Sequence, residues 1–142
     1  MVPSTGRLYV DAAIVIYATA RFSPYLRRAR AALRPDPDGR RTLHSSELII
    51  TETLVTAYRD RDERLEADTL QAIAGLKLEP VSKEVLELAT HFRADLRLKT
   101  PDAIHAATAQ LLGCSTFLTN DRRLRLPAGI EAVLMDDLPE PA

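Results

Sequence analysis

Short apolar runs of strand length alternate along the chain with longer stretches whose apolar residues recur at helical spacing. The short runs predict strands at residues 8–10, 42–45, 76–81, 116–119 and 130–135. The longer stretches predict helices at residues 12–18, 25–33, 47–58, 61–74, 83–98 and 100–112. Strands that alternate with helices are typical of an α/β fold, in which helices flank a short parallel β-sheet on both faces.

Helix-capping and chain-breaking residues separate these segments. Serines precede the second, third and fifth predicted helices at Ser23, Ser46 and Ser82, where a hydroxyl satisfies a free backbone N–H. The chain shows no internal repeat, low-complexity tract or linker. We therefore expect one domain over residues 1–142, with a core at about 7–135 and a loose C-terminal tail at 136–142.

The composition suits a globular domain that acts inside the cell. Hydrophobic residues make up 46% of the 142 residues and the formal net charge is −1. This charge disfavours a protein that coats nucleic acid, but a nuclease needs only a local basic rim. The apolar run at residues 12–18 is too short for a membrane span, and the N-terminus lacks the pattern of a signal peptide. We expect a cytoplasmic protein with no membrane association.

Two aspartates follow predicted strands, Asp11 after the first and Asp121 after the fourth. Ligands of open parallel sheets bind beyond the carboxyl ends of the strands, so both positions are candidates for chemistry. Glu52 interrupts an apolar helix, and Asp102 lies in the first turn of a helix rich in small residues. Each acid alone also has a structural explanation, namely a helix cap, an exposed stripe or a favourable helix dipole.

The four acids, in this order and with their surrounding segments, resemble those of PIN-domain nucleases. The segments are Pro-Asp-Ala-Ile-His-Ala-Ala-Thr-Ala, Leu-Thr-Asn-Asp and those around Asp11 and Glu52. The first two segments closely resemble those of VapC toxins from type II toxin–antitoxin pairs, and the resemblance covers residues 7–135. It implies that Asp11, Glu52, Asp102 and Asp121 are both catalytic and metal-binding. Glu47 is a less suitable match than Glu52 because it falls at the start of its helix.

A cluster of carboxylates is what metal-assisted hydrolysis requires. Two bare carboxylates about 4 Å apart repel each other by about 4 kcal/mol at an effective dielectric constant near 20, so a bound cation is favoured. Mg²⁺ and Mn²⁺ prefer hard oxygen ligands, and we expect Mg²⁺, with Mn²⁺ also accepted. The three histidines and one cysteine show no spacing typical of a zinc site.

Basic residues near these acids are candidates for holding the substrate. Asn120, Arg122 and Arg123 flank Asp121 and are our candidates for substrate binding, with Arg125 close by. A further group of arginines, on the second predicted helix, fits either a solvated face or a contact with RNA or a partner: Arg27, Arg28, Arg30 and Arg34. We interpret His105 as a packed or surface histidine rather than a general base.

The resemblance implies a metal-dependent ribonuclease that hydrolyses RNA phosphodiester bonds as a toxin. It also implies a homodimer that assembles with a small cognate antitoxin, which inserts an arginine into the acidic site. Four apolar residues of the first two helices supply either a groove for the antitoxin or part of the core: Ile14, Tyr17, Tyr25 and Leu33.

Two alternatives within the family remain open: a housekeeping RNA-processing nuclease, and a catalytically inactive PIN module that only binds. Two unrelated classes are disfavoured. Haloacid dehalogenase-type phosphatases need a second aspartate where this chain has Ala13, and response-regulator receivers need an acidic pair near the first strand, which is absent.

Overall fold

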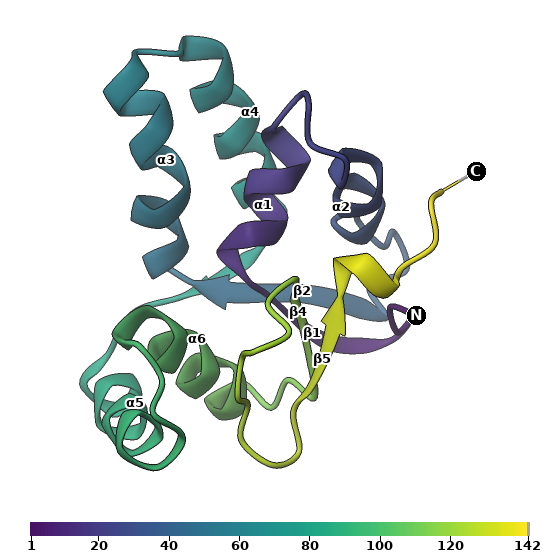
Figure 1. Cartoon of the computed structure of the whole chain (residues 1–142). Coiled ribbons are helices and arrows are strands. Elements are labelled where there is room, and N and C mark those ends of the chain that lie inside the picture. The colour runs from purple at the N-terminus through teal and green to yellow at the C-terminus, as the bar shows by residue number, and fades with distance from the viewer. Residues whose placement is uncertain (142) are drawn as a thin grey trace.

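A computed structural model describes residues 1–141 and contains a five-stranded parallel sheet (Figure 1). Its strands are β1 (Gly6–Val10), β2 (Arg41–Ser46), β3 (Lys77–Glu79), β4 (Thr116–Thr119) and β5 (Glu131–Leu134). They are ordered β3-β2-β1-β4-β5, and every neighbouring pair is parallel. The first strand is therefore central, and its carboxyl end lies in the middle of one edge of the sheet.

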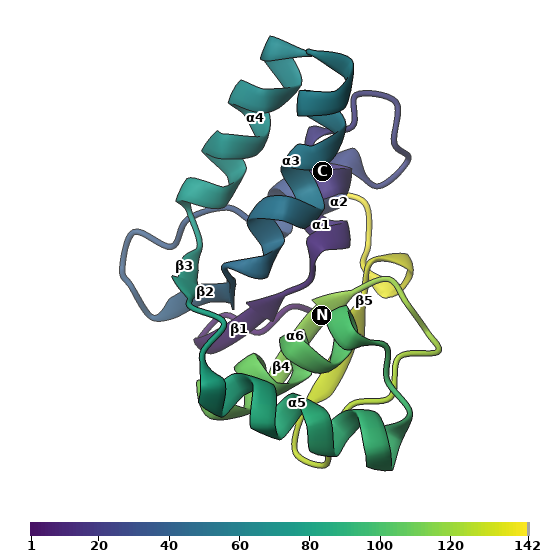
Figure 2. The ribbon, with the colours of Figure 1, turned by 90° about the vertical axis from the view of Figure 1, so that its left-hand side faces the viewer.

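Six α-helices cover both faces of this sheet. They are α1 (Ala12–Thr19), α2 (Leu26–Ala32), α3 (Leu48–Asp60), α4 (Glu63–Ala74), α5 (Lys83–Leu96) and α6 (Thr100–Leu111) within the described chain. Helices α1 to α4 lie on one face, and α5 and α6 lie on the other (Figures 1 and 2). The predicted α/β fold, a short parallel sheet with helices on both faces, is confirmed.

The ends of several elements differ from the prediction by a few residues, for local reasons. β3 is shorter than residues 76–81 because the Leu76 N–H donates to the Ile73 carbonyl in the turn after α4, and because Pro80 has no N–H to donate to a ladder. α5 ends at Leu96 because Arg97 adopts a left-handed conformation with φ 55°. The side chain of Asp62 accepts a hydrogen bond from the Leu65 N–H, so α4 begins at Glu63.

The central strand is buried on both faces. Leu8 and Val10 belong to the core beneath the first four helices, whereas Tyr9 belongs to the core on the α6 side. Ile14 is fully buried in the first of these cores, so for this residue the core interpretation is correct. Tyr17, Tyr25 and Leu33 are partly buried and pack against the same core.

The C-terminal tail is held to the body of the protein more firmly than expected. Leu138 is 8% exposed and joins the same core as Met135, to which a 3-10 turn (Met135–Asp137) connects it. Arg28 also approaches Glu140, with 3.6 Å between Nε and Oε1. Ala142 lies outside the described residues.

No helix within residues 1–141 combines the length and the apolar character needed to cross a membrane.

Candidate functional site

Asp11 stands at the carboxyl end of the central strand and also caps α1. Its Oδ1 accepts a hydrogen bond of 2.8 Å from the Ala12 N–H. Its Oδ2 accepts a second bond of 2.8 Å from the hydroxyl of Thr119, the last residue of β4. The structural role expected for a lone aspartate is therefore real, but one oxygen is held by a neighbouring strand and not by the helix.

Thr119 connects two of the predicted acids. While its hydroxyl donates to Asp11, the same oxygen accepts a bond of 3.2 Å from the Asp121 N–H. Asp121 is exposed, and its Oδ1 accepts from the Arg123 N–H at 2.9 Å. Because Thr119 is fully buried, it fixes the backbone after β4 against the end of β1.

Glu52 reaches the site from α3, where His105 of α6 holds it. The two side chains approach to 2.6 Å between Glu52 Oε1 and His105 Nε2. The other ring nitrogen, Nδ1, lies 2.5 Å from the Tyr9 hydroxyl. An ionised carboxylate only accepts hydrogen bonds, so Nε2 carries the proton. Tyr9 and Glu52 thus bond to opposite sides of one ring, and a chain of hydrogen bonds runs from β1 through α6 to α3.

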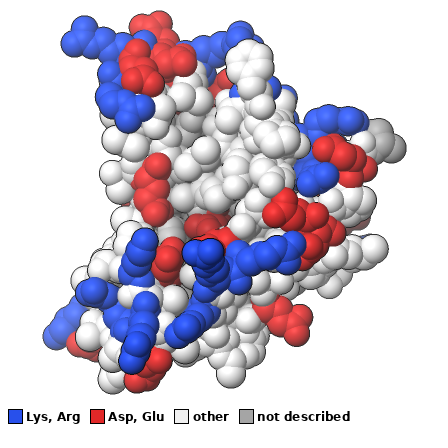
Figure 3. Space-filling model, in the orientation of Figure 1, with Lys and Arg blue, Asp and Glu red and all other residues white. Residues whose placement is uncertain are grey.

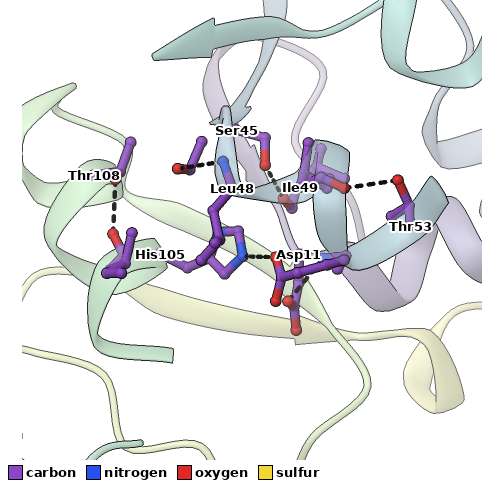
Figure 4. A network of polar contacts seen from close by, with 12 residues as sticks. Asp11, Ser45, Leu48, Ile49, Thr53, His105 and Thr108 are labelled. Atoms are coloured by element: carbon purple, nitrogen blue, oxygen red, sulfur yellow. Dashed lines mark hydrogen bonds and ion pairs between the residues drawn. The ribbon is translucent and has the colours of Figure 1, made fainter. Parts of the chain in front are cut away.

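The position of His105 shows what the sequence interpretation missed. The ring is 1% exposed, so it is packed as expected, yet it bonds directly to a candidate catalytic acid. In Figure 4 the ring extends from α6 into the region of Asp11, and the dashed line from its nitrogen marks the contact with the Glu52 carboxylate. The available signal was spacing: His105 follows Asp102 by three residues, which places both on one face of a helix.

Asp102 is half-buried in the first turn of α6 and experiences the charges of the other three acids. Burial raises the pKa of its carboxyl, and the negative charges of Asp11, Asp121 and Glu52 raise it further, against an opposing effect of His105. The carboxyl of Asp102 therefore experiences the charges of all three other predicted acids. Figure 3 shows acidic side chains in the middle of this face, with a band of basic side chains below them.

Asp11 experiences the same environment. Burial raises the pKa of its carboxyl, while His105 and the Thr119 hydroxyl act in the opposite direction. A raised pKa means that the ionised form is disfavoured, by burial and by neighbouring negative charge. A cation placed between the acids would remove that cost.

The oxygen donors of the four acids match the ligand preference of a hard divalent cation. In residues 1–141, no three histidine, cysteine, aspartate or glutamate side chains are arranged so as to hold a metal ion. The four acids offer carboxylate oxygens alone, which suits Mg²⁺ or Mn²⁺ better than zinc. Their joint role as ligands and catalytic groups stays a prediction.

The three candidate substrate-binding residues have different surroundings. Arg123 lines a groove that also contains Asp102 and Asp121. Arg122 instead forms an ion pair of 2.8 Å with Asp137, and Asn120 Oδ1 accepts from the Asp136 N–H at 3.0 Å. Two of the three thus tie the loop after β4 to the 3-10 turn.

The arginines of α2 are also engaged within the molecule. Arg27 donates to the Pro141 carbonyl at 2.8 Å, and Arg30 donates to the Ala18 carbonyl at 3.0 Å. Arg28 lies beside Glu140, as described above. These contacts give the basic helix a role in holding neighbouring segments, alongside its solvent-facing surface.

Comparison with known proteins identifies the family of the chain. The model of the PIN domain family matches residues 8–130, a span that includes all four acids. No curated protein sequence matches the chain.

Solved structures with a similar fold include a toxin–antitoxin complex from Klebsiella pneumoniae, with 24% identity, a TM-score of 0.67, and coverage of 92% of this chain and 98% of that one. VapBC2 from Rickettsia felis, bound to a DNA fragment from its promoter, has 14% identity, a TM-score of 0.69, and coverage of 91% and 98%. The sarcin-ricin loop cleaving toxin VapC20 from Mycobacterium tuberculosis has 17% identity, a TM-score of 0.63, and coverage of 78% and 86%. At these identities the likeness concerns the fold.

Proposed function

The chain belongs to the PIN-domain family, and on this premise we propose that it is a metal-dependent endoribonuclease acting as the toxin of a toxin–antitoxin pair. The observation that supports this function is that the Asp102 carboxyl experiences the negative charges of three further acids, Asp11, Asp121 and Glu52. Support for the toxin role comes from similar folds: one is a toxin–antitoxin complex, one is VapBC2, and one is described as a sarcin-ricin loop cleaving toxin.

Asp11, Glu52, Asp102 and Asp121 would hold Mg²⁺, or Mn²⁺ in its place. When bound there, such an ion would supply Lewis acidity toward a phosphate oxygen and would lower the pKa of a water molecule. The chain's own residues set the geometry: Thr119 orients Asp11 through Oδ2, and His105 orients Glu52 through Oε1. Such supporting hydrogen bonds keep each ligand in one rotamer and so reduce what must be ordered when the ion enters.

The site repels a phosphodiester until its negative charge is neutralised. We assign the nearest phosphate contact to Arg123, whose groove includes Asp102 and Asp121. Asn120 and Arg122 support the same loop through their contacts with residues 136 and 137. A guanidinium at this position binds a phosphate with charge-assisted hydrogen bonds.

The partner in this proposal is a small antitoxin that neutralises the acidic site. Arginine suits this role because its planar guanidinium donates two parallel hydrogen bonds to a carboxylate. We expect a homodimer of this chain in the assembly, and we expect both proteins to act in the cytoplasm, where RNA substrates are found.

Cleavage by purified protein tests the enzymatic part. We expect single-stranded RNA to be cut with Mg²⁺ or Mn²⁺ and to stay intact when the metal is chelated. Asp11→Asn should remove most activity, whereas the control Asp38→Asn changes an exposed acid in the loop before β2 and should retain it. Equal cleavage by Asp11→Asn and wild type at equal metal would show that Asp11 is not a ligand.

Growth tests the toxin role separately from the chemistry. Expression of the wild type alone should slow growth, and Asp102→Ala should relieve the effect at equal protein abundance. Co-expression with the protein of a neighbouring small gene should restore growth and abolish cleavage in the purified complex. Normal growth with a wild type that cleaves RNA would instead indicate a housekeeping nuclease, and a chain that neither binds metal nor cleaves RNA would be a binding module.

A further inference from the structure

A groove of about 530 Å³ adjoins the acidic site on the side of α5 and α6. Residues 96–99, which end α5 and lead into α6, form one part of its lining, and residues 123–125, after β4, form another. Asp102 and Asp121 belong to the same lining. A ligand in this groove therefore lies directly beside two of the four acids.

Four cations line this groove: Arg97, Lys99, Arg123 and Arg125. All four are exposed, and none forms an ion pair within 4.0 Å with a carboxylate of residues 1–141. Arg122, in the same loop, differs because it is paired with Asp137. The groove thus keeps uncompensated positive charge next to a negative centre, an arrangement that attracts an anion able to bridge toward a metal.

Apolar side chains lie among these cations. Leu96 and Leu124 are half-buried and Leu98 is buried, and all three line the groove. A surface with basic side chains around apolar ones matches a single nucleic-acid strand, which presents charged phosphates and unstacked bases together. The bases of a duplex are stacked and paired, so they cannot contact the leucines. An acidic peptide does not alternate charged groups with apolar ones as regularly as a single nucleic-acid strand does.

We propose that this groove, which we call the basic groove, binds the single-stranded RNA segment next to the scissile phosphate. Arg97 and Lys99 contact phosphates from the α5–α6 side, and Arg123 and Arg125 contact them from the loop after β4. This proposal rests on the proposed ribonuclease function and adds the path of the substrate along the protein. It also adds two cations, Arg97 and Lys99, which are distant in sequence from every site acid except Asp102.

Binding measurements on two double variants test the path. The variants are Arg97→Gln with Lys99→Gln, and Arg123→Gln with Arg125→Gln, each in an Asp11→Asn background that prevents cleavage. The matched control is Arg21→Gln with Arg64→Gln, which removes the same charge from exposed residues of another hollow. The probe is a labelled single-stranded RNA of mixed sequence and about 12 nucleotides, followed by fluorescence anisotropy with Mn²⁺ at several salt concentrations.

Each basic-groove pair should lower RNA affinity about tenfold or more, as expected for the loss of two charge-assisted contacts. The slope of log affinity against log salt should become shallower by about 1.4, from about 0.7 for each lost contact with a single strand. The control pair should keep the affinity and slope of its parent. With Asp11 restored, the basic-groove pairs should raise KM more than they lower kcat, because the acids are unchanged.

Several outcomes would overturn the basic groove. Wild-type affinity and slope in both basic-groove pairs would do so, as would an equal loss in the control pair. Unchanged RNA binding combined with weaker antitoxin binding would assign the groove to a protein partner instead. Wild-type protein that cleaves RNA while the groove variants bind normally leaves the proposed function standing, whereas wild type without metal binding or cleavage removes the proposed function itself.

Discussion

His105 is the residue whose surroundings say most about how the site is held. Both ring nitrogens are used, one toward Tyr9 and one toward Glu52, and the ring itself is buried. A buried imidazole with two partners has one preferred orientation, so it also fixes the rotamer of the carboxylate it holds. We therefore regard His105 as a positioning residue for Glu52.

Replacement of His105 should weaken metal binding and cleavage together. His105→Ala should lower the affinity for Mn²⁺ and the cleavage rate by about 10- to 100-fold, the usual effect of losing such a supporting contact. Tyr9→Phe removes the bond between residue 9 and His105 but keeps the bond between His105 and Glu52. It should therefore lower the free energy of unfolding by about 1–3 kcal/mol, with a smaller effect on cleavage. Calorimetric Mn²⁺ titration and cleavage assays check this. Equal values for His105→Ala and for the exposed control His91→Ala would contradict it.

The raised pKa of Asp102 makes the metal-free protein sensitive to pH. The folded protein binds this proton more tightly than the unfolded chain, so stability falls as pH rises from the ordinary aspartate pKa of about 3.9 through the raised value. Asp102→Asn should remove this loss. We expect the metal-free variant to melt at a higher temperature than the wild type at neutral pH.

The advantage of Asp102→Asn should disappear in acid, where the wild-type carboxyl is also protonated. It should also disappear with saturating Mn²⁺, which stabilises the wild type by binding to its folded form. Thermal unfolding across pH, with and without metal, measures both effects. The control Asp95→Asn, an exposed acid on α5, should show neither effect, and a wild type that is more stable than Asp102→Asn without metal at neutral pH would refute this account.

At the scale of elements, the ends of β1 and β4 are joined by a side chain as well as by the ladder between the strands. Leu8 to Val10 pair with Thr116 to Leu118, and one residue later the Thr119 hydroxyl bridges to Asp11. The strands therefore align the backbone, while the hydroxyl aligns the carboxylate. The two contributions can be separated because a valine retains the shape of threonine without its hydrogen bonds.

The same substitution at two buried threonines should have opposite consequences. Thr119→Val leaves Asp11 Oδ2 without its donor and should lower cleavage about 10- to 100-fold. Thr69→Val on α4 removes a buried hydroxyl that has no hydrogen-bond partner in residues 1–141, so it should stabilise the fold by about 1 kcal/mol and leave cleavage unchanged. Thermal unfolding and cleavage of both variants provide the comparison. A loss of activity in Thr69→Val, or full activity in Thr119→Val, would be evidence against it.

At the scale of the whole molecule, the site lies where the two helical layers meet the carboxyl edge of the sheet. Glu52 comes from the α1–α4 layer, Asp102 and His105 come from the α5–α6 layer, and Asp11 follows the central strand. Figure 1 shows the two layers on opposite faces of the sheet. The acids therefore stay together only if both layers pack on the sheet. Stability of the core and geometry of the site are linked in this way.

The buried tail residue Leu138 should contribute to that stability. Leu138→Ala should cost about 2–3 kcal/mol, because the lost methyl groups leave a cavity in the core beneath α1 and α2. Phe22→Ala is the control, since Phe22 is 99% exposed and should be replaceable at almost no cost. Urea unfolding of both variants measures the difference. Equal stability of the two would mean that the tail is as loose as its composition suggests.

The identity and order of the elements followed from local pattern, and so did the four acids. Strand and helix periodicity needs only neighbours along the chain, and the position of Asp11 and Asp121 after strands already placed them at one edge. Element ends were less predictable: the left-handed residues at Arg61 and Arg97 end α3 and α5, and nothing in their residue type requires that conformation.

Contacts between segments that are distant in sequence could not be predicted from local sequence pattern. Tyr9 and His105 are bonded although 96 positions separate them, and Asp11 and Thr119 are bonded across 108 positions. Arg122, which we expected to bind substrate, forms an ion pair with Asp137. A side chain's partner depends on which elements become neighbours and at what register, and neither is encoded in a single segment. The sequence by itself determined the elements, the α/β class and the acids available for chemistry. Only the tertiary structure decided which groups hold those acids and which cations stay free beside them, because hydrogen bonds and ion pairs act at contact distance.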